Sequence, residues 1–259
     1  MNKITLLFQT KKNNILSIFF TAGYPTTDST ATILKSLEEN GVDMVEIGIP
    51  YSDPLADGTT IQQSSSSAIK NGMTLDLLFT QLDELKGNIK IPLILMGYYN
   101  PVMQYGIEKF CNKAASVGIS GVILPDLPII EYTSKYQKYF EGSNLSIIYL
   151  ITPQTPDERI RLIDSVSNGF IYAVSSSSTT GKSNDFDDSQ IEYLKKINSL
   201  GLKNPIIVGF GIHNKTTLNT AWQYANGAIV GSAYINQLTK HNDIEVATHK
   251  LLMQLKEQI

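Results

Sequence analysis

The chain has 259 residues, of which 42% are hydrophobic and 17% charged, and its formal net charge is -3. This composition is typical of soluble globular proteins and does not favour a partner that is a nucleic acid. No apolar run approaches the ~20 residues of a membrane-spanning helix, and the single cysteine, Cys111, excludes an intramolecular disulfide framework and a cysteine cluster for zinc.

The N-terminal segment, residues 1–14, has a short apolar patch and then lysines, so we expect no export signal. We expect its first dozen residues to form a helix. The frequent use of Asn, Lys, Ile, Ser and Tyr is typical of an AT-rich coding genome. We therefore expect the protein in the bacterial cytoplasm, or in the plastid stroma.

Short β-branched runs alternate with amphipathic segments along nearly the whole chain. The runs that predict strands are 16–21, 44–49, 91–96, 121–125, 146–151, 170–175, 204–210 and 227–231. Helical spacing of apolar residues covers 27–41, 75–87, 106–118, 155–166, 188–201 and 215–227, and a terminal helix over 247–259 is expected to pack on the outside. In the first of these helices, Asp28 is a candidate N-cap and Gly41 a C-terminal stop.

Near-continuous Val, Ile and Leu runs indicate strands that are buried on both faces, as in parallel sheets. Eight β/α units in one chain fit a closed barrel better than an open sheet. No linker or shift in composition divides the sequence. We therefore predict one domain, residues 1–259, with an α/β fold: a single (β/α)8 TIM barrel whose extra N-terminal helix closes the barrel bottom.

The segment 45–58, VEIGIPYSDPLADG, places one acid, Glu46, inside an apolar strand and another, Asp57, in the loop that follows. An unpaired carboxylate is costly to bury, so Glu46 is a candidate general acid or base. Strand ends and the loops after them form the reactive face of such barrels, so both acids can meet there. A buried acid satisfied by backbone or lysine, and an ordinary Asp-Gly turn, are the structural alternatives.

Glycine-bearing loops follow the sixth, seventh and eighth predicted strands. The pair GFGI and GSA can bring backbone N–H groups, and a helix N-terminus at Gly231-Ser232, to a phosphate. The three histidines form no cluster with metal-ligand spacing, and no predicted strand holds a lysine in its apolar core. Carboxylate acid/base catalysis on a phosphorylated small molecule is the chemistry that remains.

The motifs VEIGIPYSDPLADGTTIQ, MGYYNP, GVILPDLP and the GFGI and GSA pair occur in this order between Phe19 and about Ile235. Together they resemble the tryptophan synthase alpha subunit. The resemblance implies retro-aldol cleavage of indole-3-glycerol phosphate to indole and glyceraldehyde 3-phosphate. It implies no metal and no cofactor on this chain, with pyridoxal phosphate only on a partner beta subunit in an alpha2beta2 heterotetramer.

By the same resemblance, Glu46 protonates the indole carbon that bears the side chain and helps to remove the glycerol hydroxyl proton, while Asp57 holds the indole N–H. The implied substrate-binding residues are Phe19, Ile61, Leu95, Leu124, Ile151 and Tyr172 around the indole, Gly181, Gly211, Gly231 and Ser232 at the phosphate, and Thr180 in a mobile loop. The implied partner contacts are Pro50, Asp53 and Asn100.

Two places depart from the family pattern. Thr59 stands where the family commonly has a proline. In the loop ending Ser178-Thr179-Thr180-Gly181, Ser178 and Thr179 stand where the family has a glycine and an apolar residue. Three alternatives stay open beside the partner-dependent lyase. The chain could act chiefly as an allosteric partner of the beta subunit, or as a stand-alone lyase. If the acid motif is coincidental, it could be another phosphate-binding barrel, such as a phosphosugar isomerase or a thiamine-phosphate-type synthase.

Overall fold

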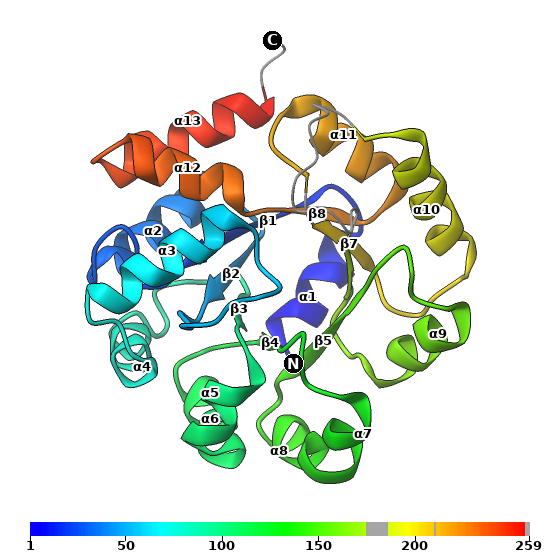
Figure 1. The fold of residues 1–259 in the computed structure, drawn as a ribbon, viewed down its shortest axis with the longest axis horizontal. Helices are drawn as coiled ribbons and strands as arrows, with labels where there is room; N and C mark the ends of the chain where they lie inside the picture. The colour runs from blue at the N-terminus through cyan, green and yellow to red at the C-terminus, as the bar shows by residue number, and fades with distance from the viewer. Residues whose placement is uncertain (175–185, 210, 257–259) are drawn as a thin grey trace.

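The computed structural model describes residues 1–174, 186–209 and 211–256. Eight parallel strands form a closed barrel in the order β1 to β8, and helices surround it (Figure 1). The strands are β1 Ile15–Thr21, β2 Met44–Gly48, β3 Leu93–Met96, β4 Gly121–Ile123, β5 Ser146–Ile151, β6 Ile171–Val174, β7 Ile206–Gly209 and β8 Gly227–Val230. The predicted (β/α)8 TIM barrel is confirmed, and each predicted run contains most or all of one strand.

Helix α1 precedes β1, and the other helices lie between the strands or after β8. They are α1 Lys3–Thr10, α2 Ser29–Glu39, α3 Thr59–Lys70, α4 Leu75–Glu84, α5 Tyr99–Tyr105, α6 Ile107–Ser116, α7 Ile129–Glu131, a π-helical turn η1 Tyr132–Tyr136, α8 Gln137–Gly142, α9 Asp157–Val166, α10 Asp188–Ser199, α11 Lys215–Tyr224, α12 Ser232–Lys240 and α13 Ile244–Lys256. None of these described helices is long and apolar enough to cross a membrane.

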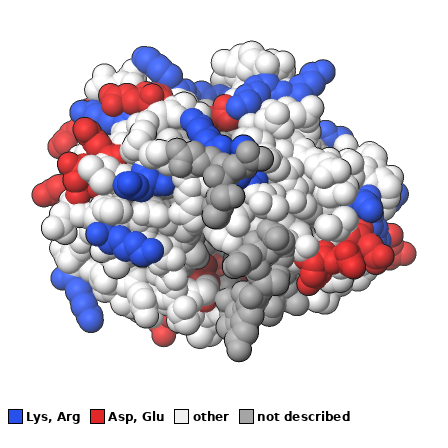
Figure 2. All heavy atoms as spheres, turned by 90° about the horizontal axis from the view of Figure 1, so that it is seen from above, with Lys and Arg blue, Asp and Glu red and all other residues white. Residues whose placement is uncertain are grey.

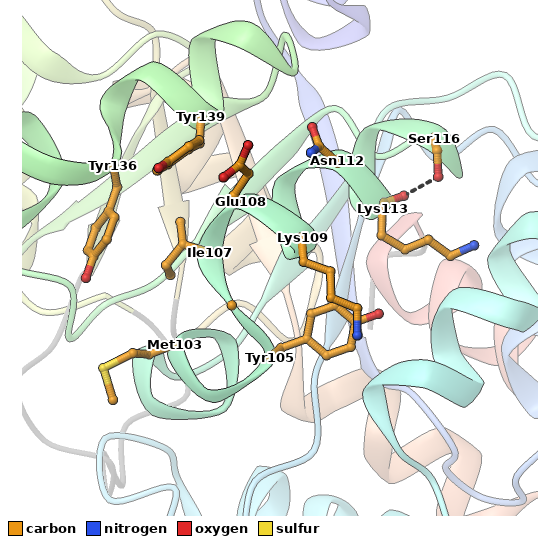
Figure 3. Close-up of a pocket in the computed structure, with 11 residues that line it drawn as sticks. Met103, Tyr105, Ile107, Glu108, Lys109, Asn112, Lys113, Ser116, Tyr136 and Tyr139 are labelled. Carbon is orange, nitrogen blue, oxygen red and sulfur yellow. Dashed lines mark hydrogen bonds between the residues drawn. The ribbon is translucent and has the colours of Figure 1, made fainter.

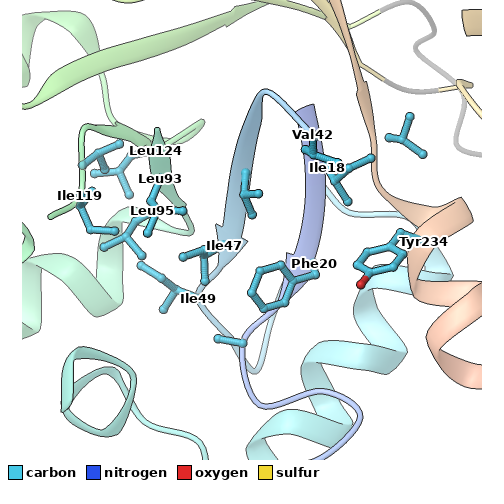
Figure 4. Packing of buried hydrophobic residues seen from close by; sticks show 14 of the residues in the cluster. Ile18, Phe20, Val42, Ile47, Ile49, Leu93, Leu95, Ile119, Leu124 and Tyr234 are labelled. Atoms are coloured by element: carbon cyan, nitrogen blue, oxygen red, sulfur yellow. The ribbon is translucent and has the colours of Figure 1, made fainter. Parts of the chain in front are cut away.

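Successive side chains on a strand point to opposite faces, and this alternation builds two cores. One core lies inside the barrel and includes Ile15, Met44 and Ile94. The other core lies between the outer faces of the strands and the helices. Figure 4 shows a part of this outer core, with Phe20, Ile47 and Tyr234 near β1, β2 and α12. A residue's place in its strand therefore decides whether it can reach the barrel interior.

The helix α1 closes the end of the barrel at which the strands begin. Its Ile4 is fully buried and belongs to the inner core. Asn2, the N-cap of α1, donates from Nδ2 to the carbonyl oxygens of Ser120 and Asn144 at 2.7 and 2.8 Å. At the other end of the sequence, α13 packs against α12 and α2 on the outside of the barrel (Figure 1). Both terminal helices lie where the sequence predicts them.

The termini of α2 agree only in part with their prediction. Gly41 follows the helix with φ of +77°, a conformation that favours glycine. Asp28 does occupy the N-cap position, but its side chain makes no capping hydrogen bond. The predicted N-cap position of Asp28 is therefore confirmed without a side-chain cap, because its backbone, at φ −91° and ψ 2°, lacks the extended conformation usual for one.

Candidate active site

Glu46 lies in β2 with its side chain inside the barrel and no exposure to solvent. The Ser17 hydroxyl of β1 donates to its Oε1 at 2.9 Å, while Oε2 has no hydrogen-bond partner among the described residues. Burial raises the pKa of the Glu46 carboxyl from 4.5 to about 8, although the bond from Ser17 acts in the opposite direction. The Glu46 carboxyl can therefore gain or lose its proton at a pH close to neutrality.

Asp57 lies in the loop between β2 and α3, and it is partly buried. Its Oδ2 accepts a hydrogen bond of 3.1 Å from the Tyr98 hydroxyl, and that same hydroxyl accepts one of 3.1 Å from the Ala56 backbone N–H. Burial raises the pKa of Asp57, while the bond from Tyr98 lowers it. Tyr98 was not predicted as a site residue, although it stands inside the MGYYNP motif.

Tyr172 of β6 places a phenol next to both acids. It is buried, and burial followed by the charges of Glu46 and Asp57 raises its pKa well above 10.0. A Cβ on Gly209 of β7 would lie 2.1 Å from the Tyr172 Oη, so a glycine is needed beside this ring. Similarly, a Cβ on Gly48 would lie 2.6 Å from the Phe19 ring. These two glycines leave room for aromatic rings at the barrel mouth.

A cavity of about 50 Å³ lies at the carboxyl ends of the first strands, beneath the loop that carries Asp57. Three of the predicted site residues line it: Phe19, Asp57 and Ile61. Its lining also includes Met96, Tyr98 and Leu150, which were not predicted as site residues. The alternation of side chains along strands is the signal that could have found Met96 and Leu150.

Three residues predicted around the indole lie on the other face of the barrel wall. Leu95, Leu124 and Ile151 are fully buried in the outer core, between strands and helices. Their sequence neighbours Met96, Ile123 and Leu150 belong to the inner core or pack against it. Because a shift of one residue reverses the face of a strand, the structure does not bring Leu95, Leu124 and Ile151 to the inner face, and their neighbours take the inward positions.

Gly211, Gly231 and Ser232, which were predicted at the phosphate, follow the ends of β7 and β8. Gly211 has φ of +79°, which requires a glycine or a strained residue. Gly231 is the N-cap of α12, and the exposed Ser232 is its first residue. Backbone N–H groups at such a helix start attract anions. Thr180 and Gly181, the other two predicted contacts on this side, lie outside the described residues.

The residues predicted to contact a partner lie on two neighbouring segments. Asp53 is exposed and Pro50 partly buried in the loop after β2, while Asn100 is partly buried in α5. Leu55, in the same loop as Asp53, is 89% exposed. The bond between Tyr98 and Ala56 joins the two segments directly. A surface that includes an exposed apolar side chain therefore borders the Asp57 loop.

A larger groove, of about 940 Å³, lies away from the barrel mouth, beside α5, α6, η1 and α8. Figure 3 shows its lining, including Tyr136, Tyr139 and Glu108, and the Lys109 Nζ lies 4.1 Å from the centre of the Tyr105 ring. Both Glu108 and Lys109 are exposed. Asp57 lines the smaller cavity at the barrel mouth instead, so that cavity is the candidate active site.

The charges of the molecule are mixed. On the face that Figure 2 shows, basic and acidic side chains both occur, and the described basic ones form no continuous patch. Within the described part of the chain, no group of three or more His, Cys, Asp and Glu side chains could hold a metal ion.

The family model described as tryptophan synthase alpha chain matches residues 6–259. A tryptophan synthase alpha chain of Flavobacterium psychrophilum is 56% identical over 241 residues, covering 93% of this chain and 95% of the relative. That of Parabacteroides distasonis is 50% identical over 257 residues, covering 99% and 100%.

Solved structures agree with these relatives. Tryptophan synthase subunit alpha of Legionella pneumophila superimposes with a TM-score of 0.88 at 31% identity, covering 98% of this chain and 97% of that one. A chain from the tryptophan synthase complex of Pyrococcus furiosus gives 0.84 at 31% identity, with 94% and 98% covered.

Proposed function

Because the chain belongs to the tryptophan synthase alpha chain family, it is a carbon–carbon lyase that cleaves indole-3-glycerol phosphate to indole and glyceraldehyde 3-phosphate, and we propose that Glu46 and Asp57 carry this reaction. It acts in tryptophan biosynthesis and passes indole to a beta subunit. The observation that supports the roles of the two acids is the buried Glu46 carboxyl, which has one oxygen held by Ser17 and the other without a described partner.

Protonated Glu46 begins the reaction. With a pKa of about 8, its carboxyl is mainly protonated at neutral pH and can donate to the indole carbon that bears the glycerol chain. The ring then carries a positive charge, and Asp57 accepts a hydrogen bond from its N–H. For this role Asp57 must be ionised, a state that the bond from Tyr98 favours.

Glu46 is left ionised by this first step and acts next as a base. It removes the proton of the glycerol hydroxyl next to the ring, the oxygen forms a carbonyl, and the carbon–carbon bond breaks. The bonding electrons return to the ring and restore neutral indole, and Glu46 is protonated again. One carboxyl therefore supplies and recovers one proton in each cycle, without a metal or an imine.

The rest of the mouth binds the two ends of the substrate. We assign the indole to Phe19, Ile61 and Tyr172, with the inward-facing Met96, Ile123 and Leu150 in place of their neighbours. We assign the phosphate to Gly211, Gly231 and Ser232, and by family resemblance to Thr180 and Gly181. Ligand sites usually measure roughly 300 to 1,000 Å³, so side chains around the cavity of about 50 Å³ must separate to admit the substrate.

The partner is the beta subunit, in an alpha2beta2 heterotetramer. We propose that Pro50, Asp53 and Asn100 contact it, since Pro50 and Asp53 share the loop that carries Asp57 and Asn100 lies on the neighbouring segment. Pyridoxal phosphate then belongs to the beta subunit, and this chain holds no cofactor of its own. The relatives from Flavobacterium and Parabacteroides are bacterial, which favours the bacterial cytoplasm over the plastid stroma as the place of action.

The test is indole release from indole-3-glycerol phosphate by the purified chain. We expect Glu46→Gln and Asp57→Asn to abolish release while circular dichroism stays unchanged, and the exposed control Glu84→Gln to retain wild-type turnover. Substantial turnover by Glu46→Gln would contradict the assignment. Repeating the assay with added beta subunit separates a partner-dependent lyase from a stand-alone one, and beta activation without indole release would indicate a chiefly allosteric role.

A further inference from the structure

Ser17 is a polar side chain in the inner wall of the barrel. On β1 it lies between Ile15 and Phe19, the two residues that share its face, and it is fully buried. Its register partners are Met44 of β2 and Ile229 of β8, both apolar. A hydroxyl in such surroundings is costly unless it is hydrogen-bonded. Its bond partner is Oε1 of Glu46, at 2.9 Å.

The two oxygens of Glu46 are therefore not equivalent. Oε1 is held by Ser17 from the adjacent strand, and Oε2 is buried with no described partner. Holding one oxygen fixes the rotation of the carboxyl group and leaves the other to exchange a proton. We propose that Ser17 is a positioning residue, which fixes Glu46 through Oε1 so that Oε2 delivers the proton to the substrate and recovers it. The inference rests on the proposed role of Glu46.

Other groups near Glu46 do not supply this hydrogen bond. Among the described residues, Tyr172 from β6 and Asp57 from the loop after β2 are the titratable groups that face this part of the barrel, and Tyr98 is bonded to Asp57. The high pKa of Tyr172 keeps its phenol neutral at ordinary pH. Replacing Ser17 changes none of these groups, so its effect on Glu46 can be measured separately from theirs.

The experiment compares Ser17→Ala, which removes the hydroxyl, with Ser17→Thr, which keeps one. Ser17→Cys nearly preserves the shape with a weaker donor, and it replaces Ser17→Ala if the alanine variant does not fold. Ser146→Ala is a matched control: Ser146 is also buried, but its hydroxyl donates to the Asn168 carbonyl at 3.0 Å, at the start of β5 and away from the mouth.

Two measurements are made on the full chain, and the first is the rate of indole release as a function of pH. For Ser17→Ala we expect kcat for indole release to fall roughly tenfold to a hundredfold, with little change in KM. A fall of this size corresponds to the loss of one hydrogen bond to a charged group. We also expect the alkaline limb of the pH–kcat profile to move to higher pH, because the bond from Ser17 favours the ionised carboxyl. Ser17→Thr should restore both values, and Ser146→Ala should change neither.

The second measurement needs no turnover. Carbon-13 NMR of chain labelled at the glutamate carboxyl follows the titration of Glu46, whose signal is identified by its loss in Glu46→Gln. We expect its pKa to rise in Ser17→Ala and to return in Ser17→Thr. A titration and a pH profile identical to wild type in Ser17→Ala would overturn the inference, whereas an active Glu46→Gln would instead overturn the proposed function.

Discussion

Glu46 combines an ionisable side chain with complete burial, so its stability contribution must depend on pH. Its pKa is raised from 4.5 to about 8 in the folded protein, so the folded state binds more protons than the unfolded state between these values. The contribution is fully present below pH 4.5 and is lost as pH rises toward 8. We therefore expect the free energy of unfolding of wild type, relative to Glu46→Gln, to fall over this range.

Urea unfolding of both proteins at pH 5 and pH 8 measures this difference. Glutamine cannot ionise, so position 46 contributes to the pH dependence of stability in wild type only. The other titrating groups are the same in the two proteins, so their contributions to the difference cancel. We expect a relative loss of several kcal/mol in wild type at the higher pH. A constant difference between the two proteins would mean that water reaches Glu46 in solution and keeps its pKa ordinary.

Gly209 leaves the space that Tyr172 occupies. A Cβ at position 209 would meet the Tyr172 hydroxyl and ring carbons at 2.1 to 2.3 Å. Because the ring is buried, it cannot move without disturbing the mouth, so Gly209→Ala should cost about 1 to 3 kcal/mol of stability and reduce kcat/KM. Thermal unfolding and indole release measure the two effects.

Gly142 provides the control for that substitution. It lies at the end of α8, and a Cβ there has no heavy atom within 4 Å. Gly142→Ala should leave activity unchanged and should not destabilise the protein, because alanine favours a helix more than glycine does. Equal effects of the two substitutions would show that close contact with Tyr172 is not the cause.

The segments around the mouth are joined by a few side chains. Tyr98, immediately before α5, bonds both Asp57 and the Ala56 N–H of the loop after β2. Tyr98→Phe removes both bonds, so we expect kcat/KM to fall about tenfold and Asp57 to hold its position less well. Tyr105→Phe, at the end of α5, is the control, since Tyr105 bonds Asp76 on α4, outside the mouth. Similar losses in both variants would contradict a specific role for Tyr98.

The helix α3 shows why part of this arrangement could not be predicted. Its sequence, TTIQQSSSSAIK, has no clear apolar stripe, so the spacing of apolar residues did not predict this helix. In the structure Ser64 bonds Thr21, and Ser65 accepts from the Tyr51 N–H and donates to its carbonyl. Ser65 therefore satisfies the backbone of the loop after β2, and Ser64 joins α3 to β1. Both uses depend on tertiary contacts and leave no periodic signal in the sequence.

The strands show the opposite case. Their apolar runs are strong enough to place all eight in order, because strands buried on both faces remain apolar throughout. The same uniformity hides which residues face inward, and this is why Leu95 was chosen in place of Met96. Glu46 could be found from sequence because a charge interrupts the run. Ser17 could not, since serine is common in apolar strands and its bond partner lies on another strand.

At the scale of the whole molecule, the two ends of the barrel have different tasks. Side chains for chemistry lie at the carboxyl ends of the strands, while α1 packs Ile4 into the opposite end. Ile4 is fully buried, and a Cβ on Gly121 would lie 2.7 Å from its Cδ1, which shows how closely it packs. Loss of this side chain should therefore affect stability without changing the acids at the mouth.

Ile4→Ala is the substitution that tests this separation. We expect it to lower the free energy of unfolding by about 2 to 5 kcal/mol, because a cavity opens where the barrel is closed. Under conditions where the variant stays folded, kcat and KM for indole release should equal those of wild type. Leu6→Ala on the same helix is the control: Leu6 is 46% exposed and should cost much less stability. A fall in kcat for folded Ile4→Ala would mean that packing at the closed end also sets the geometry of Glu46, and that the barrel transmits strain along its full length.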